Sequence, residues 1–256
     1  MNTYFNIPEE INHSFDMMSV EPAHFDALFA AGFRMLGYRY LRHQEAYHNG
    51  FHCITMPLRI RLSEFTPSKS QRIVLKRNAD LIVRRTKILY LKDEKMLFDK
   101  HFQRVEDFMS DLRRYSPDAK FFPQRNAKFK IFTPDGRYVA SSYVHWGEQG
   151  MSATYGIHDP EAPTHRSLGT FTMLQEMEYA KKLGLKYYYH GYAFDIPSAF
   201  DYKFTLNGLE TYDWMLKQWL PLKRKDATKW RSELQYLYSL EQDEQDMYRF
   251  IKRTSV

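Results

Sequence analysis

Residues 151–203 read MSATYGIHDPEAPTHRSLGTFTMLQEMEYAKKLGLKYYYHGYAFDIPSAFDYK, and this stretch decides the fold. A strand pattern is followed by a polar loop, and Ser167 and Gly169 mark the entry into a helix over Leu168–Leu183. Gly184 ends that helix, and a second strand rich in tyrosine follows. Such a strand–loop–helix–strand unit leaves backbone N–H groups unpaired at the helix start, where they can hold a phosphate or a polarised carbonyl.

The segments around this unit predict further strands and helices. KFKIFT and RYVASSYVHW, joined by Asp135-Gly136, predict an antiparallel meander that leads into the unit. Ser68 followed by Gln71 is typical of a capped helix that runs to Asn78. The remaining expectations are an extended arm over 1–20, a helix from Pro22 to Gly32, two strands between 36 and 64, a strand over 80–90, an amphipathic helix over 92–115, a connection over 116–126, a last strand near 209–214 and a peripheral helix in 226–256.

These elements predict an α+β fold with a mixed sheet flanked by helices, built as one sheet or as two related halves. We expect an N-terminal arm over 1–20, an N-terminal α+β half with a basic helix over 21–116, an acyltransferase-like half over 117–215 and a helical tail over 216–256.

The composition excludes several classes of protein. At 256 residues and 43% hydrophobic content the chain is typical of a soluble globular protein. Cys53 is its one cysteine, which excludes an internal disulfide and a thiolate-rich zinc site, and the loop histidines 43, 48 and 52 lack the spacing of a metal site. No apolar run spans a bilayer, and the N-terminus lacks a signal-peptide pattern, so we expect a cytoplasmic protein.

The net charge of +6 becomes informative because cations gather in one stretch. On the predicted helix the basic residues recur at spacings of three to five, on one broad side. With neighbouring serines they could contact a phosphate backbone, and a solvated helix face explains them equally well. The candidate residues for binding a nucleic-acid phosphate backbone are Arg59, Ser68, Lys69, Ser70, Arg72, Lys76 and Arg77.

Three features near the quoted unit could carry chemistry, and each has a purely structural interpretation. Asp159 follows a strand and could accept a proton, although Asp before Pro is also a common turn starter. Ser167 and Gly169 could shape an anion site or simply cap the helix. The tyrosine run with Gly191 could bind a substrate or form core strand packing with a bulge.

Four blocks of the chain together resemble the arginyl-tRNA–protein transferase family, including its bacterial branch that transfers leucine. The blocks are FDALFAAGFRMLG, PLRIRLSEFTPSKSQRIVLKRN, SATYGIHDPEAPTHRSLGTFTMLQEMEYAKKLGLKYYYHGY and DYKFTLNGLE. They cover roughly Phe25 to Glu210 in the order and approximate spacing of the family.

The resemblance implies a GNAT-like (N-acyltransferase-like) fold that uses no acetyl-CoA and no other cofactor. It implies an enzyme that moves an amino acid, Arg or Leu, from aminoacyl-tRNA to the N-terminal amine of an acceptor protein that begins with an acidic residue. The matching motifs place Asp159, Glu210, Tyr202 and Lys203 as catalytic candidates, with Asp159 or Glu210 orienting the amine. Substrate-binding candidates are Tyr155, Ser167, Leu168, Gly169, Tyr189, Gly191 and Tyr192, and the backbone N–H groups of Leu168 and Gly169 would support the oxyanion.

The chain departs from the family at two places. The cysteine cluster that precedes the block MPLRI is missing, and Pro197-Ser198-Ala199-Phe200 stands where the family has C-P-K-M. Two alternatives therefore stay open: a GNAT-like acyltransferase with another acyl donor, and a non-catalytic relative that binds tRNA or protein N-termini. Against the first, the loop H-R-S-L-G-T lacks the glycine-spaced pyrophosphate loop of that superfamily.

Overall fold

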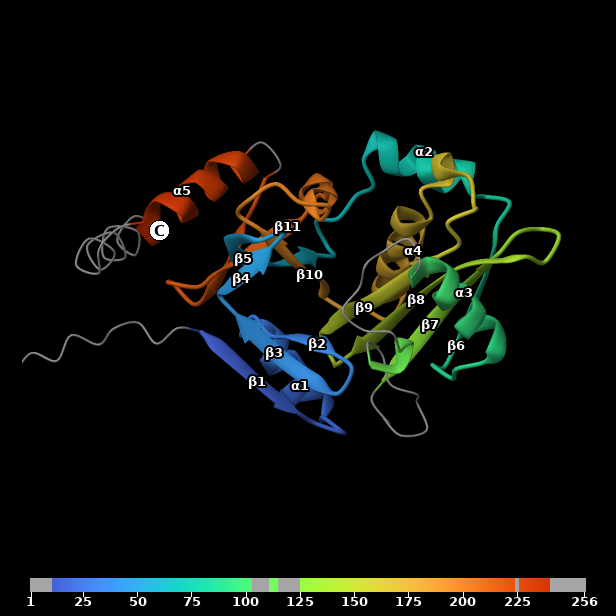
Figure 1. Cartoon of the computed structure of the whole chain (residues 1–256), viewed down its shortest axis with the longest axis horizontal. Coiled ribbons are helices and arrows are strands. Elements are labelled where there is room, and N and C mark those ends of the chain that lie inside the picture. The colour runs from blue at the N-terminus through green and yellow to red at the C-terminus, as the bar shows by residue number, and fades with distance from the viewer. Residues whose placement is uncertain (1–10, 103–110, 115–124, 224–225, 240–256) are drawn as a thin grey trace, which may run out of the picture.

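The computed structural model describes residues 11–102, 111–114, 125–223 and 226–239. Within them the chain forms one nine-stranded sheet with helices on both faces, and a separate three-stranded sheet (Figure 1). The strands of the large sheet lie in the order β12-β11-β5-β10-β9-β8-β7-β6, and β4 pairs with β5. Their bounds are β4 (Glu45–His48), β5 (Phe51–Arg61), β6 (Ile82–Thr86), β7 (Asn126–Phe132), β8 (Tyr138–Trp146), β9 (Gly150–His158), β10 (Tyr187–Phe194), β11 (Leu209–Asp213) and β12 (Gln218–Pro221).

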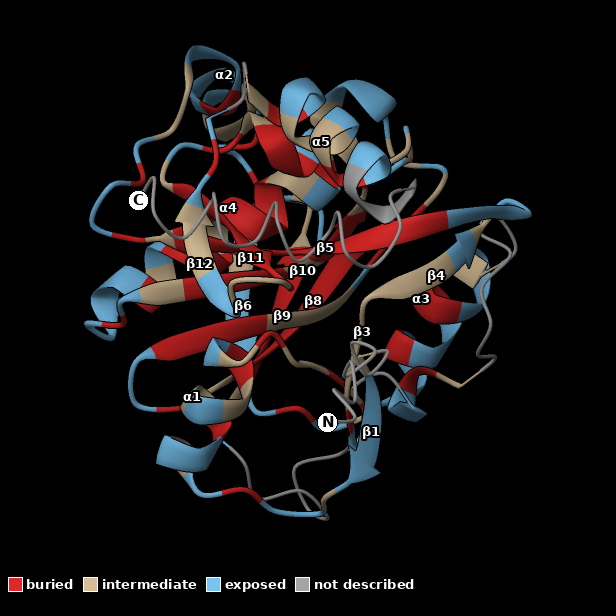
Figure 2. Ribbon diagram, turned by 90° about the vertical axis from the view of Figure 1, so that its left-hand side faces the viewer, coloured by how far each residue is buried: buried red, intermediate tan, exposed pale blue. Residues whose placement is uncertain are grey.

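The helices cover the two faces of this sheet. They are α1 (Pro22–Ala30), α2 (Lys69–Arg77), α3 (Lys92–Phe102), α4 (Leu168–Lys182) and α5 (Ala227–Ser239). The main core lies between the sheet and α4, while a second cluster packs under α1 and a third under α3. Figure 2 shows the buried residues concentrated along the central strands. The prediction of an α+β fold with a mixed sheet flanked by helices is confirmed.

Several sequence-predicted elements form where expected. β7, β8 and β9 make the antiparallel meander, with Gly136 (φ 89°) in its first turn. Ser68 and Gln71 form the reciprocal capping box at the start of α2. Gly184, with φ 73°, allows the chain to leave α4 in the left-handed conformation that favours glycine.

Three expectations need correction or fall outside the described residues. Residues 12–16 of the expected arm form β1 (Asn12–Asp16), which pairs with β3 (Arg39–His43), and β3 pairs with β2 (Arg34–Leu36). The helix expected to run to residue 115 is described only as α3, and residues 103–110, most of 116–126 and 240–256 lie outside the described part.

The two predicted halves contribute strands to the same sheet. β5, from the first half, lies between β10 and β11 of the second, and β6 pairs with β7. The domain boundaries therefore stay a prediction.

A single aspartate ties α1 to the turn between β8 and β9. Asp26 accepts hydrogen bonds from the backbone N–H groups of Glu148, Gln149 and Gly150 at 2.7–2.9 Å. A carboxylate that accepts several N–H bonds is well satisfied, so α1 is held firmly against this end of the sheet.

The strands β9 and β10 begin side by side and then separate. They are parallel and pair only over Gly150–Ser152 and Tyr187–Tyr189, whereas the other described strand pairs of the sheet are antiparallel. At the point of separation both strands are irregular: the β9 register shifts around Thr154, and the β10 register shifts around His190 beside Gly191 (φ 77°). Bulges bend strands, so the sheet opens into a wedge at this level.

Candidate functional site

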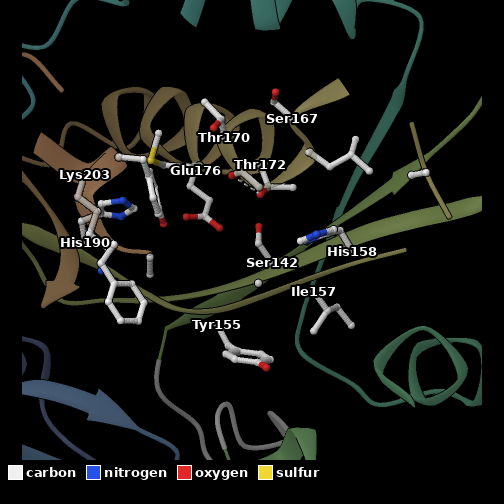
Figure 3. Close-up of a pocket in the computed structure, with 18 of the residues that line it drawn as sticks. Ser142, Tyr155, Ile157, His158, Ser167, Thr170, Thr172, Glu176, His190 and Lys203 are labelled. Atoms are coloured by element: carbon white, nitrogen blue, oxygen red, sulfur yellow. Dashed lines mark hydrogen bonds between the residues drawn. The ribbon is translucent and has the colours of Figure 1, made fainter. Parts of the chain in front are cut away.

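The wedge between β9 and β10 holds a cavity of about 540 Å³, closed on one side by α4 (Figure 3). One wall is the part of β9 beyond its pairing with β10, and the other is the bulged part of β10 with the segment after it. The residues that line it include Ser142, Thr154, Tyr155, His158, Asp159, Ser167, Leu168, Gly169, Thr172, Glu176, Tyr188, His190, Phe200, Tyr202 and Lys203.

The central ionisable group of the cavity is Glu176. α4 presents Leu168, Thr172 and Glu176 to the cavity at spacings of four residues, which places them on one side of the helix. Glu176 is 2% exposed, and its carboxylate accepts a hydrogen bond from the Tyr188 hydroxyl at 2.5 Å. Burial raises the pKa of the Glu176 carboxyl to about 7, and the Ser142 and Tyr188 hydroxyls lessen the rise. No cation pairs with it among the described residues, so it can exchange a proton near neutral pH.

His190 and Lys203 form one end of the cavity. Both are buried, and the His190 ring nitrogens have no hydrogen-bond partner among the described residues. Lys203 Nζ donates to the Tyr192 carbonyl at 2.7 Å and lies 4.7 Å from the centre of the Phe200 ring. Burial, assisted by the charge of Arg34, lowers the pKa of Lys203 to about 7. Tyr202, half exposed, packs edge-on against His190 with ring centres 5.6 Å apart.

The other end of the cavity is the start of α4. Ser167 precedes the helix in the left-handed conformation (φ 49°), and its side chain makes no capping hydrogen bond. A Cβ built on Gly169 would meet no atom within 4 Å, so the backbone there faces open space. The first N–H groups of α4 therefore remain available to an anion that enters the cavity.

The helix α2 lies beside this mouth. Asn78 Nδ2 donates to the Arg166 carbonyl at 2.7 Å, and the Arg77 guanidinium donates to the His165 carbonyl. The Arg166 side chain in turn pairs with Asp80 at 2.6 Å. These contacts join the end of α2 to the loop that opens α4. The exposed polar side chains of α2 lie on the helix that ends beside the mouth. They are Lys69, Ser70, Arg72, Lys76 and Arg77.

The mouth and Glu176 are too far apart to act on one atom. Leu168 and Glu176 are eight residues apart in α4, which is about 12 Å along a helix axis. The predicted oxyanion role of the Leu168 and Gly169 N–H groups therefore does not fit a reaction at Glu176. At the mouth, these N–H groups can donate hydrogen bonds to an anion such as a phosphate.

Several predicted residues lie in the cavity wall but differ in what their side chains do. Asp159 is 3% exposed; its carboxylate accepts from Arg137 Nη2 at 2.6 Å and from the backbone N–H of Glu161 at 2.9 Å. Burial alone would raise the pKa of Asp159, but the bonds from Arg137 and Glu161 lower it overall, so it stays ionised and structural. The Tyr155 ring points away from the cavity (Figure 3) and packs near Phe98 and His101 under α3.

The remaining tyrosine candidates do not line the cavity. Tyr189 is buried against Phe29 and Trp219 in the α1 cluster. Tyr192 is buried, and its hydroxyl donates to the Gly32 carbonyl at 2.6 Å. Gly191 forms the predicted bulge, and a Cβ there would lie 3.6 Å from Lys203 Nζ. That distance is an ordinary van der Waals contact, so glycine is favoured here by its positive φ of 77°.

Glu210 and Arg59 are also placed elsewhere. Glu210 is 2% exposed and pairs with Arg59 Nε at 2.6 Å and with the Arg61 guanidinium. Arg59 is buried between the rings of Tyr187 and Trp219, 3.9 and 4.4 Å from their centres. The structure therefore brings neither Glu210 into the cavity nor Arg59 to the α2 surface. Ser68 is likewise occupied, because its hydroxyl caps α2.

Two general findings complete the description. Among the described residues, no three His, Cys, Asp or Glu side chains gather as metal ligands. In that same part of the chain, no helix has the length and apolar character needed to cross a membrane.

Glu176, Tyr188, Ser142 and His190 are the site residues that the sequence-based reasoning missed. The signal for Glu176 is its spacing of eight from Leu168 and four from Thr172, at an otherwise buried helix position. A carboxylate on the buried side of a helix calls for an explanation, and the cavity supplies it. His190 lay inside the quoted tyrosine run and was not singled out.

Comparisons with known proteins find sequences similar to this chain. The C-terminal domain of arginine-tRNA-protein transferases matches residues 89–213. The aspartate/glutamate leucyltransferase of Marinobacter nauticus is 32% identical over 206 residues, covering 75% of this chain and 83% of that protein. The enzyme of the same name from Leptospira interrogans is 29% identical over 208 residues, covering 78% of this chain and 75% of that one. Among solved structures, FemX aligns with a TM-score of 0.48 at 13% identity, covering 74% of this chain and 65% of FemX.

Proposed function

The chain belongs to the arginine-tRNA-protein transferase family, and on that premise we propose that it transfers an amino acid from a charged tRNA to the N-terminal α-amine of an acceptor protein. The relatives are named aspartate/glutamate leucyltransferases, so we propose that the amino acid transferred is leucine. The observation that supports this reaction is a buried, cation-free carboxylate, Glu176, in the wedge between two parallel strands.

The reaction has modest chemical demands because the aminoacyl ester is already activated. The acceptor amine must be deprotonated, and an α-amine has a pKa of about 8. A base whose pKa lies close to that value is an efficient partner for the proton. Glu176, with its pKa raised to about 7, meets this condition, whereas the low pKa of Asp159 makes it a weak base.

We assign the steps as follows. The acceptor α-ammonium first releases one proton to solvent. The nitrogen of the neutral amine then attacks the carbonyl carbon of the aminoacyl ester and passes a second proton to the Glu176 carboxylate. The C–N bond forms, the ester C–O bond breaks, and the ribose oxygen leaves with the proton that Glu176 returns. Burial, and after it the charge of Glu176, raises the pKa of Tyr202 to about 12, so its hydroxyl stays protonated and donates a hydrogen bond to the developing oxyanion.

The donor enters over α2 and the start of α4. The exposed Lys69, Arg72, Lys76 and Arg77, with Ser70, contact phosphates of the tRNA, which is a sequence-independent interaction. The free N–H groups of Leu168 and Gly169 hold a phosphate close to the aminoacyl end. The ester then reaches about 12 Å further along α4 to Glu176.

The test is a transfer assay with the purified full-length chain. Transfer RNA charged with labelled leucine or labelled arginine is offered with peptides that begin with Asp, Glu, Ala or Lys. We expect leucine to reach the Asp and Glu peptides. Failure of both labels to reach any peptide would reject the proposal, and turnover of acetyl-CoA in a parallel reaction would favour an acyltransferase with another donor.

A further inference from the structure

Arg34 lies on β2, outside the residues that line the cavity, and is partly exposed. Its Nε is buried without a hydrogen-bond partner, and no carboxylate pairs with its guanidinium among the described residues. Its Cζ lies 5.0 Å from the centre of the Tyr192 ring. A guanidinium that is partly shielded from water and lacks a counter-ion favours the binding of an anion.

Lys203 is a second cation without a counter-ion, and it contacts the same tyrosine. Its Nζ binds the Tyr192 carbonyl, and within the described part of the chain it forms no ion pair. Arg34 lies close enough to lower the pKa of Lys203, after burial itself. It does the same to His43, whose ring centre is 5.3 Å from that of Tyr192. Around Tyr192, burial and the charge of Arg34 therefore make protonation of Lys203 and His43 less favourable.

The carboxylates on nearby segments are already occupied. Asp201 binds Arg231 at 2.6 Å, Asp195 accepts from the Ile54 N–H at 2.8 Å, and Asp213 accepts from the N–H groups of Met215 and Leu216 at 2.9 Å. These hydrogen bonds and ion pairs engage groups other than Arg34 and Lys203. Among the described residues, no carboxylate forms an ion pair with either cation, so the two can receive an anion from a bound ligand.

We propose that Arg34 and Lys203 together bind the side-chain carboxylate of the first residue of the acceptor protein. The inference rests on the proposed transfer reaction and names the residues that select the acceptor. An arginine fork and an ammonium suit a carboxylate because both can donate charge-assisted hydrogen bonds to it. Glu176 then takes the α-amine of the same residue, so one amino acid is held at both of its charged groups.

The position of the pair favours the acceptor over a tRNA phosphate. In Figure 3, Lys203 and His190 lie on the opposite side of Glu176 from Ser167, which marks the mouth. The donor occupies the side of Ser167 and α2, and the acceptor is left with the side of Lys203. The aromatic side chains of Phe200 and Tyr202 line that end, which suits a single amino-acid side chain.

The experiment compares peptides of identical sequence that begin with Asp, Asn, Glu or Gln. Wild type, Arg34→Gln and Lys203→Met are assayed for kcat/KM at saturating charged tRNA, and peptide binding to the free protein is measured by calorimetry. Arg34→Lys tests whether charge alone suffices. Arg39→Gln is the matched control, because Arg39 lies on the neighbouring strand β3 and pairs at the surface with Asp16.

We expect wild type to prefer Asp over Asn and Glu over Gln. Each neutral variant should lose roughly 10- to 100-fold in kcat/KM for the acidic peptides, mostly through KM, because a charge-assisted hydrogen bond contributes about that much. The thermal unfolding midpoint of each variant shows whether it is folded, and the ratio of kcat/KM for the acidic peptides to kcat/KM for the amide peptides reports the loss of the carboxylate contact. Arg34→Lys should retain part of the preference, and Arg39→Gln all of it.

Two results would overturn the inference while leaving the transfer reaction intact: equal use of acidic and amide peptides by wild type, or an acid preference that survives in both neutral variants. If wild type transfers to no peptide, the reaction fails. In that case calorimetry tests the carboxylate site independently. Tighter binding of the Asp peptide than of the Asn peptide, lost in Arg34→Gln, would support the site, and equal binding of the two peptides by wild type would reject it.

Discussion

Glu94 and Glu176 are buried glutamates on opposite faces of the same sheet. Glu94 lies on α3 and Glu176 on α4, and both helices pack over β8 and β9. Each carboxylate accepts a hydrogen bond at 2.5 Å from a tyrosine of the sheet, Tyr143 for Glu94 and Tyr188 for Glu176. Their exposed fractions are 0% and 2%, so burial does not distinguish them.

The difference is the counter-ion. Lys128 lies on β7 and is 2% exposed. Its ammonium donates a hydrogen bond to the Glu94 carboxylate, and the pair is buried beside the third core cluster. Glu176 has no such cation and faces a cavity instead. A neutralised carboxylate stabilises one arrangement of the core, whereas an uncompensated one is left able to exchange protons. Burial of an acid is thus informative about function only together with what it pairs with.

The largest effect is expected at Glu176. Glu176→Gln keeps the shape and the Tyr188 hydrogen bond but removes the base, so transfer should fall by roughly 100- to 10,000-fold. Initial rates with saturating charged tRNA measure this, and the chemical denaturation midpoint serves as the folding control. Near-normal transfer by a folded Glu176→Gln protein would mean that the amine loses its proton to another group.

The opposite outcome is expected on the other face. Lys128→Met leaves Glu94 buried without its partner, which should lower the free energy of unfolding by about 3 to 5 kcal/mol. Transfer per folded molecule should change little, because this pair does not reach the cavity. Urea unfolding measures the free energy of unfolding, and the transfer rate per folded molecule measures the activity. Lys95→Gln is the control on the same helix, since its surface pair with Asp99 should contribute less than about 1 kcal/mol.

Glu176 also predicts opposite pH responses for stability and activity. Its pKa is raised from 4.5 to about 7 on folding, so between these values the folded protein retains a proton that the unfolded chain has released. The free energy of unfolding should therefore fall as pH rises from 4.5 to 7, by up to about 3 kcal/mol for this group. Transfer should rise through pH 7 as the base ionises. The difference between wild type and Glu176→Gln isolates the contribution of Glu176 to the free energy of unfolding and to the transfer rate. If the pH curves of the two proteins run parallel, Glu176 is not the group that titrates.

The smallest effect is expected from the exposed charges on each face. Lys76→Gln with Arg77→Gln should raise KM for charged tRNA by several-fold to about tenfold at physiological salt and reduce the salt dependence of binding. Replacing Lys95 and Lys100 of α3 in the same way should leave KM for tRNA unchanged. Equal effects from the two helices would mean that the tRNA is attracted by overall charge and not guided along α2.

The sequence predicts the local parts of this design better than its long-range pairings. The Ser68 cap, the Gly184 helix end, the meander and the Gly191 bulge follow from short patterns and are found as expected. Glu210 and Arg59 matched family motifs, yet they meet each other across β11 and β5, residues 151 positions apart. Only the strand order reveals that pairing, just as only the packing of α4 over the wedge reveals Glu176. Local patterns do not specify which strands become neighbours.

The placement of β5 also has a consequence for how the protein is made. This apolar strand, with Cys53–Ile60 buried throughout, is flanked by β10 and β11, which are synthesised more than 120 residues later. In a nascent chain β4 can already pair with residues 51–54 of β5, but residues 55–61 stay without strand partners until residues 187–213 have left the ribosome. Unpaired apolar edges are templates for aggregation. Release of chains that stop within α4 should yield insoluble fragments, and the ribosome-bound chain is a natural client for a chaperone that covers exposed strands.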